Sequence, residues 1–121
     1  MHRRMTSPSR VLIVEDEPLI AMMLEDFLDM LDRQVAGTAD NCAHALALIE
    51  GGGIDAAILD VNLRGGERSW PVADALAARG VPFVVATGGG DDSVEPAHRG
   101  RPRLQKPFTM DHVEKVLGEL A

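Results

Sequence analysis

A lysine and three carboxylates stand directly after short apolar segments of this chain. Lys106 follows RLQ, Asp60 follows AAIL, and the pair Glu15 and Asp16 follows VLIV. The only other lysine is Lys115, near the C-terminus, so a lysine at the end of an apolar segment is a specific feature. If the segments are parallel strands, these side chains gather at one edge of the sheet, where open α/β folds place their sites.

Thr87 follows a further apolar segment, FVVA, and adds a hydroxyl to the same edge. Three carboxylates in a partly dry site repel one another, so we expect a hard divalent cation such as Mg²⁺ to neutralise them. Lys106 offsets part of the charge. The sequence therefore predicts an acidic, magnesium-binding edge with one ammonium group and one hydroxyl.

This combination suits phosphoryl transfer, which requires positioning and neutralisation of charge more than covalent help from the protein. Asp60 ends the segment expected at the centre of the sheet, which favours it as the acceptor that forms an acyl phosphate. The Thr87 hydroxyl could donate to a phosphoryl oxygen once the group is present. Taken singly, Asp60 could be a strand-end cap, Thr87 an ordinary strand residue and Lys106 a surface lysine. Their spacing, taken together, favours a common phosphoryl-transfer site over these separate roles.

Apolar segments of strand length alternate with segments of helical period, the pattern of βαβ units around a parallel sheet. We predict an α/β fold with a doubly wound, five-stranded parallel sheet and strands at 10–14, 34–38, 55–60, 82–87 and 103–106. Helices are predicted from Pro18 to Leu31, over 41–50, from Pro71 to Gly80, and over 109–120. The glycine-rich stretch before the last strand predicts a short or frayed fourth helix.

Single residues give further expectations. In the first helix Leu19, Met22, Met23, Phe27, Met30 and Leu31 recur at helical spacing, and we expect the methionines to fill the core. Trp70 is expected to pack at the start of the third helix or to anchor a partner. The lone Cys42 is expected to be a small buried residue. His2, His44, His98 and His112 show no ligand spacing, which indicates exposed or packed histidines rather than a transition-metal site.

The 121 residues predict one domain over 10–121, preceded by a disordered tail over 1–9. The net charge of −7 argues against nucleic-acid binding. A basic cluster of Arg99, Arg101, Arg103 and Lys106 is either a solvated loop or a docking patch for a partner. No segment has the length to span a bilayer, so we expect a cytoplasmic protein without membrane association.

The ordered motifs VLIVEDEP, AAILDVNLRGG, FVVATG and LQKPF resemble those of the receiver domains of two-component response regulators. The resemblance extends from Arg10 to Leu120. It implies a flavodoxin-like (βα)5 fold, a Mg²⁺ requirement, and phosphorylation by a histidine kinase or a histidine phosphotransfer protein.

By motif position, the resemblance makes Asp60 the phosphoacceptor, Thr87 the switch hydroxyl and Lys106 the lysine that contacts the phosphoryl group. Pro107 is the proline that is usually cis in this family. The metal ligands implied are Glu15, Asp16, Asp60 and the backbone carbonyl of Asn62.

More narrowly, the chain resembles an alphaproteobacterial subgroup named for a Phe-Ala-Thr-Gly-Tyr type motif. Two positions depart from the pattern, because Gly89 stands where that motif has Tyr, and Arg103 stands where many receivers have an aromatic residue. An aromatic switch is therefore missing. The shortened segment between Thr87 and Lys106 also argues against the dimer face of transcriptional receivers, so we expect a monomer.

The leading hypothesis is a single-domain response regulator, which is not an enzyme and acts by phosphorylation-controlled binding of an effector protein. A phosphate sink is a close variant. A degenerate receiver that serves only as a scaffold is a second alternative, favoured by the missing aromatic switch. A small Mg²⁺-dependent aspartyl-phosphate phosphatase is a third, opposed by Asn62 at the position where a second general acid would stand.

Overall fold

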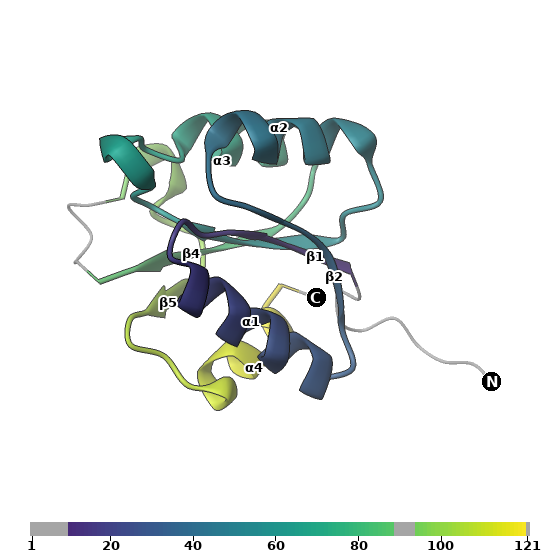
Figure 1. Ribbon diagram of the computed structural model, residues 1–121. Coiled ribbons are helices and arrows are strands. Elements are labelled where there is room, and N and C mark those ends of the chain that lie inside the picture. Colours follow the sequence, from purple (N-terminus) through teal and green to yellow (C-terminus); the bar gives the residue numbers. More distant parts are fainter. Residues whose placement is uncertain (1–9, 89–93, 121) are drawn as a thin grey trace.

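Five parallel strands form one sheet, with two helices packed on each face (Figure 1). The computed structural model describes residues 10–88 and 94–120. The strand order is β2-β1-β3-β4-β5. The strands are β1 (Arg10–Val14), β2 (Gln34–Ala39), β3 (Ala56–Asp60), β4 (Phe83–Thr87) and β5 (Arg103–Gln105). The predicted fold class is confirmed, and each predicted strand agrees with the structure to within one residue at either end.

The helices lie in pairs, α1 and α4 on one face and α2 and α3 on the other (Figure 1). They are α1 (Pro18–Met30), α2 (Cys42–Gly51), α3 (Trp70–Ala78) and α4 (Met110–Gly118). Short 3-10 turns, η1 (Arg64–Gly66) and η3 (Pro96–His98), follow β3 and β4. In the described residues between β4 and β5, η3 is the only helical turn, in agreement with a short fourth helix.

Local sequence explains where the helices begin. Pro18 occupies the first turn of α1, where proline loses no hydrogen bond. Asn41 caps α2, because its side-chain oxygen accepts the backbone N–H of His44 at 2.8 Å. Thr109 caps α4 in the same way, accepting the N–H of His112 at 3.3 Å.

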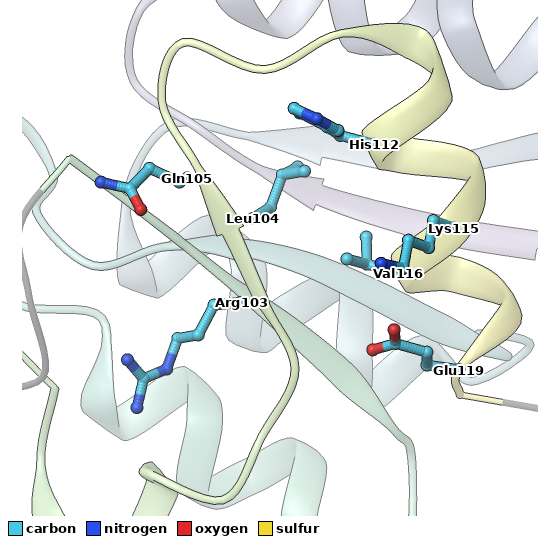
Figure 2. Close-up of a pocket in the computed structure, with 7 residues that line it drawn as sticks. All are labelled: Arg103, Leu104, Gln105, His112, Lys115, Val116 and Glu119. Carbon is cyan, nitrogen blue, oxygen red and sulfur yellow. The ribbon is translucent and has the colours of Figure 1, made fainter.

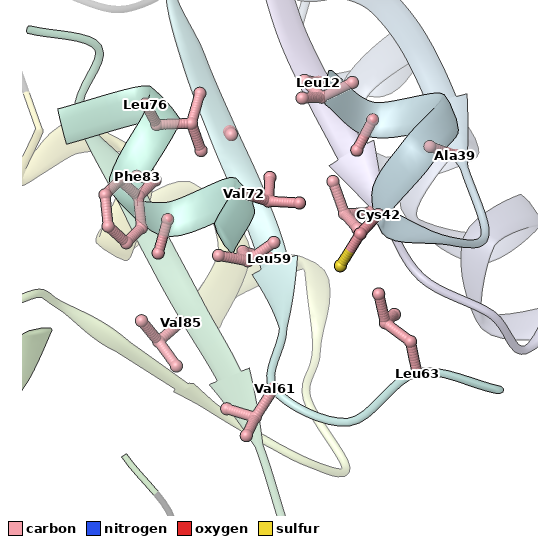
Figure 3. Close-up of a cluster of buried hydrophobic side chains, with 14 of the residues drawn as sticks. Leu12, Ala39, Cys42, Leu59, Val61, Leu63, Val72, Leu76, Phe83 and Val85 are labelled. Carbon is pink, nitrogen blue, oxygen red and sulfur yellow. The ribbon is translucent and has the colours of Figure 1, made fainter. Parts of the chain in front are cut away.

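The sheet separates two apolar cores. Strands β3 and β4 are buried along their whole length, as expected for central parallel strands covered on both faces. Figure 3 shows the core beneath α2 and α3, where Leu59 and Val85 of the sheet pack with Val72 and Leu76 of α3. Cys42 belongs to this core and is 6% exposed, which confirms the prediction of a small buried residue.

The expectation that the α1 methionines fill the core is wrong for two of them. Met22 is 51% exposed and Met30 is 65% exposed, and Leu19 on the same helix is 77% exposed. The buried stripe of α1 consists instead of Ala21, Leu24 and Leu28. These three residues recur at helical spacing too, so the period alone did not identify which stripe faces the sheet.

The arginines before and at the start of β5 stabilise their own segment. Arg99 Nε donates to the carbonyl oxygen of Val94 at 3.0 Å, and Arg103 Nη2 donates to the carbonyl oxygen of Arg99 at 2.9 Å. The Arg101 guanidinium lies 4.3 Å from the centroid of the Phe83 ring. These contacts fold the segment onto itself and onto β4.

Two predictions lie outside the described residues, namely the disordered tail over 1–9 and the substitution of Gly89 for tyrosine. Among the helices that the structure describes, none combines the length and the apolar character needed to cross a membrane.

Candidate functional site

Three acidic side chains meet at the carboxyl ends of two neighbouring strands. Val14 of β1 lies opposite Leu59 of β3 in the sheet, so the residues that follow them, Glu15 and Asp60, come side by side. Glu15, Asp16 and Asp60 each place a carboxylate oxygen within 4.8 Å of the others. Glu15 is 3% exposed and Asp60 is 6% exposed, so the charges lie in a largely dry site.

Lys106 links two of these carboxylates. Its Nζ atom lies 3.1 Å from Oδ2 of Asp60 and 3.2 Å from Oε1 of Glu15. Its backbone N–H donates to the carbonyl oxygen of Thr87 at 3.1 Å, which fixes the start of the turn after β5. The Lys106-Pro107 peptide bond is cis, as the family resemblance implied.

Burial and charge set the protonation of this group. Burial, together with the neighbouring Asp60, raises the pKa of Glu15 from 4.5 to about 7. Burial alone would lower the pKa of Lys106, but the attraction of Asp60 and Glu15 outweighs it and raises that pKa. Lys106 is therefore a persistent cation, and it compensates only part of the negative charge of three carboxylates.

The donor set fits a hard cation. Carboxylate and carbonyl oxygens are the ligands that Mg²⁺ prefers, and Glu15, Asp16 and Asp60 offer three such oxygens close together. Burial and the nearby charge of Asp60 raise the pKa of Glu15, and a bound divalent ion would offset the repulsion between the two carboxylates.

The predicted carbonyl ligand, Asn62, lies just beyond Asp60. An isolated antiparallel bridge pairs Asn62 with Arg68. Its hydrogen bonds run from Leu63 N–H to the Glu67 carbonyl and from Ser69 N–H to the Val61 carbonyl. The bridge therefore does not use the carbonyl oxygen of Asn62.

The predicted switch residue, Thr87, is the last residue of β4 and is 5% exposed. Asp60 lies opposite Ala86 in the sheet, so Thr87 stands one position beyond the neighbour of Asp60. All the predicted side chains thus lie at one edge of the sheet.

One cavity lies beside this edge of the sheet, and a groove lies apart from it. A cavity of about 260 Å³ opens beside the acidic group and is lined by Glu15, Asp16, Pro18, Ala21, Thr38, Asp40 and His44. A groove of similar size lies between β5 and α4 (Figure 2). The groove is lined by Arg103, Leu104, Gln105, His112, Lys115, Val116 and Glu119, and no residue of the acidic group reaches it.

Sequence reasoning missed one buried polar contact. His98 is 4% exposed, and its Nε2 atom lies 2.9 Å from Oδ1 of Asp74. The imidazole stacks on Trp70, which confirms a packing role for that tryptophan.

The chain is similar in sequence to known proteins over most of its length. Residues 11–117 match the family model described as the response regulator receiver domain. The transcriptional regulatory protein TcrA of Mycobacterium tuberculosis is 33% identical over 118 residues, covering 86% of this chain. The chain spans 42% of the length of TcrA, less than half of that protein.

Several solved structures are similar to this chain in both fold and sequence. The solution structure of SdrG from Sphingomonas melonis Fr1 is 70% identical, with a TM-score of 0.84, and the match covers 93% of this chain and 95% of that one. The BeF3-activated conformation of SdrG from Pseudomonas melonis Fr1 is 67% identical with a TM-score of 0.81, covering 97% and 100%. The PhyR receiver domain of Erythrobacter litoralis is 28% identical with a TM-score of 0.81, covering 94% and 90%.

Proposed function

Because the chain belongs to the response regulator receiver domain family, we propose that it accepts a phosphoryl group on Asp60 and signals by phosphorylation-controlled protein binding. Receiver domains of two-component systems are signalling regulators. The observation that supports this assignment best is the buried Asp60 carboxylate, held 3.1 Å from the ammonium of Lys106 beside Glu15 and Asp16.

In the proposed step, an oxygen of Asp60 attacks the phosphorus of a phosphohistidine on the donor protein. The new O–P bond forms as the N–P bond breaks, and the electron pair of that bond stays on the leaving imidazole, which then takes up a proton. Lys106 holds the Asp60 carboxylate in place and neutralises charge on the incoming oxygens. The product is an acyl phosphate at Asp60.

Glu15, Asp16, Asp60 and the carbonyl of Asn62 would hold Mg²⁺, which when bound supplies positive charge for the phosphoryl oxygens. Thr87 is the proposed switch residue, donating its hydroxyl to a phosphoryl oxygen. Arg103 replaces an aromatic residue, and its guanidinium is bonded to the Arg99 carbonyl. We therefore place the output in the segment after Thr87 rather than in the rotation of an aromatic ring.

The proposed partner is a histidine kinase or a histidine phosphotransfer protein that docks on α1. This helix begins two residues after Asp16, and Leu19 and Met22 on its first turns are 77% and 51% exposed. Large apolar side chains exposed beside a reactive group are typical of a protein interface.

The remaining proposals are an effector protein as second partner, a monomeric state, a cytoplasmic location, and no binding to nucleic acid or membranes.

Intact-mass measurement after incubation with acetyl phosphate tests the phosphoacceptor. We expect one phosphoryl adduct that requires Mg²⁺ and is absent in Asp60→Asn. Asp26→Asn, an exposed carboxylate on α1, is the matched control and keeps the adduct. If the wild type gives no adduct with acetyl phosphate or with a phosphorylated histidine protein, the scaffold hypothesis replaces this one.

The docking proposal has its own test, in which the rate of phosphotransfer is compared for two donors. Leu19→Glu is expected to slow transfer from a phosphorylated histidine protein at least tenfold and to leave the reaction with acetyl phosphate unchanged. Met30→Glu is the matched control, since Met30 is 65% exposed at the far end of α1. An equal effect of both variants on the protein donor would contradict docking at the start of α1.

A further inference from the structure

A second cluster of metal-ligand atoms lies away from the acidic edge. Asp74 of α3 and the pair Glu95 and His98 in and beside η3 each offer one donor atom within 4.8 Å of the others. The set contains one imidazole nitrogen and two carboxylate oxygens. It contains no residue of the acidic site and joins two elements that are separate in sequence.

The imidazole is buried and held in a fixed orientation. His98 stacks on the Trp70 ring with centroids 5.7 Å apart and an interplanar angle of 18°. It also meets the Phe83 ring edge-on, with centroids 5.6 Å apart. A ligand whose rotamer is already fixed by packing loses little conformational entropy on binding a metal.

Two carboxylates, those of Asp74 and Glu95, lie beside this imidazole. In the described part of the chain, no ion pair joins a lysine or arginine to Asp74 or Glu95. The Glu95 side chain does not cap the η3 turn either. Two carboxylates close together, facing one imidazole nitrogen, thus form a site whose charge a divalent cation would balance.

The pair of His98 and Asp74 requires only a small movement to bind a metal. Nε2 of His98 and Oδ1 of Asp74 are 2.9 Å apart, and ligand atoms around a tetrahedral zinc ion lie about 3.4 Å from one another. The Asp74 side chain is 65% exposed, so it can move by the required few tenths of an ångström. Glu95 directly precedes the η3 turn that ends at His98, and the donor atoms of the two side chains lie within 4.8 Å of each other.

We propose that Asp74, Glu95 and His98 bind a divalent transition-metal ion of the Zn²⁺ or Co²⁺ type. An imidazole ligand selects such ions over Mg²⁺. Three protein ligands leave one coordination position for water. Bound metal would connect α3 to the segment between Thr87 and β5, the segment assigned above to the output.

The site is expected to be weaker than a structural zinc site. When a metal occupies Nε2, the other ring nitrogen, Nδ1, carries the proton. Nδ1 of His98 is buried and has no hydrogen-bond partner within the described residues. The loss of such an outer partner lowers metal affinity by about tenfold to a hundredfold.

Trp70 provides the assay, since it is the only tryptophan in the chain and lies against His98. The full chain is titrated with Co²⁺ in excess Mg²⁺, which fills the oxygen-only site, and Trp70 fluorescence is followed. We expect saturable quenching that Zn²⁺, which does not quench, reverses. Calorimetry with Zn²⁺ should then give one site per chain.

The variants separate the two sites. Glu95→Gln and Asp74→Asn are each expected to weaken Co²⁺ binding at least tenfold, while circular dichroism shows a folded chain. Asp60→Asn and Glu114→Gln, on the acidic edge and on α4 across the sheet, should retain it. Quenching that does not saturate, persists unchanged in Glu95→Gln and Asp74→Asn, or disappears in Asp60→Asn would overturn the proposal.

Discussion

The stability of the fold should depend on pH through Glu15. Its pKa rises from 4.5 to about 7 on folding, because of burial and the nearby Asp60. A folded-state pKa above the unfolded value means that the folded chain holds the proton more tightly, so stability falls as pH rises from 4.5 to about 7. One pKa unit corresponds to about 1.4 kcal/mol, so the full contribution is about 3 kcal/mol.

Urea unfolding of the wild type and of Glu15→Gln, both in EDTA, isolates this contribution. Glutamine keeps a hydrogen-bonding oxygen near Lys106 and carries no titrating proton. Measurements between about pH 5.5 and about pH 8.5 avoid precipitation near the isoelectric point and capture about 2 kcal/mol of the effect. The free energy of unfolding of the wild type should fall by that amount relative to Glu15→Gln, from the lower pH to the higher.

A flat difference between the two proteins over this range would refute the reasoning, because it would mean that Glu15 has the same pKa in the folded and unfolded chains. A ¹³C NMR titration of the Glu15 side chain gives an independent result. A midpoint near 4.5 would likewise show that burial beside Asp60 does not hold the proton.

Three further predictions concern stability and reactivity. Leu28→Ala should lower the free energy of unfolding by about 2–5 kcal/mol, because Leu28 is fully buried, whereas Leu19→Ala on the same helix should change it by less than about 0.5 kcal/mol in the same urea experiment. Asn41→Ala should cost about 1 kcal/mol by removing the cap of α2, and Asn41→Ser should recover most of it. The Cys42 thiol, whose pKa is raised to about 11 by burial and by the nearby Glu67, should react with a thiol reagent at neutral pH only in urea; rapid labelling of the folded chain would contradict this.

The sequence predicted the sheet well because parallel strands have a strong local pattern. The segments before Asp60 and Thr87 are apolar without interruption, and both strands are buried on both faces. Since parallel strands end at one edge, the meeting of Lys106 with Asp60 across 46 residues could also be predicted.

The burial of side chains on α1 could not be predicted from its period. Two stripes of the helix are apolar, and the one that faces the sheet includes the small Ala21 while Met22 and Met30 stay outside. Choosing between the stripes requires knowledge of how the helix packs on the sheet, which only the tertiary structure supplies.

The contact between Asp74 and His98 was missed for a different reason. It joins α3 to a segment with no apolar periodicity, so no local pattern shows that His98 is buried or which residues surround it. The sequence also does not decide whether the basic cluster around the start of β5 is a loop or a docking patch, whereas in the structure Arg99 and Arg103 donate hydrogen bonds to backbone carbonyls nearby.

Chemical mapping of the phosphoryl group tests the role of Asp60 most directly. Borohydride reduces an acyl phosphate of aspartate to homoserine, which tandem mass spectrometry locates in a peptide. After incubation with a phosphodonor and Mg²⁺, we expect homoserine at position 60 and at no other aspartate, and none without the donor. Homoserine at another aspartate, or its absence from a chain that carries the phosphoryl mass, would contradict Asp60 as the acceptor.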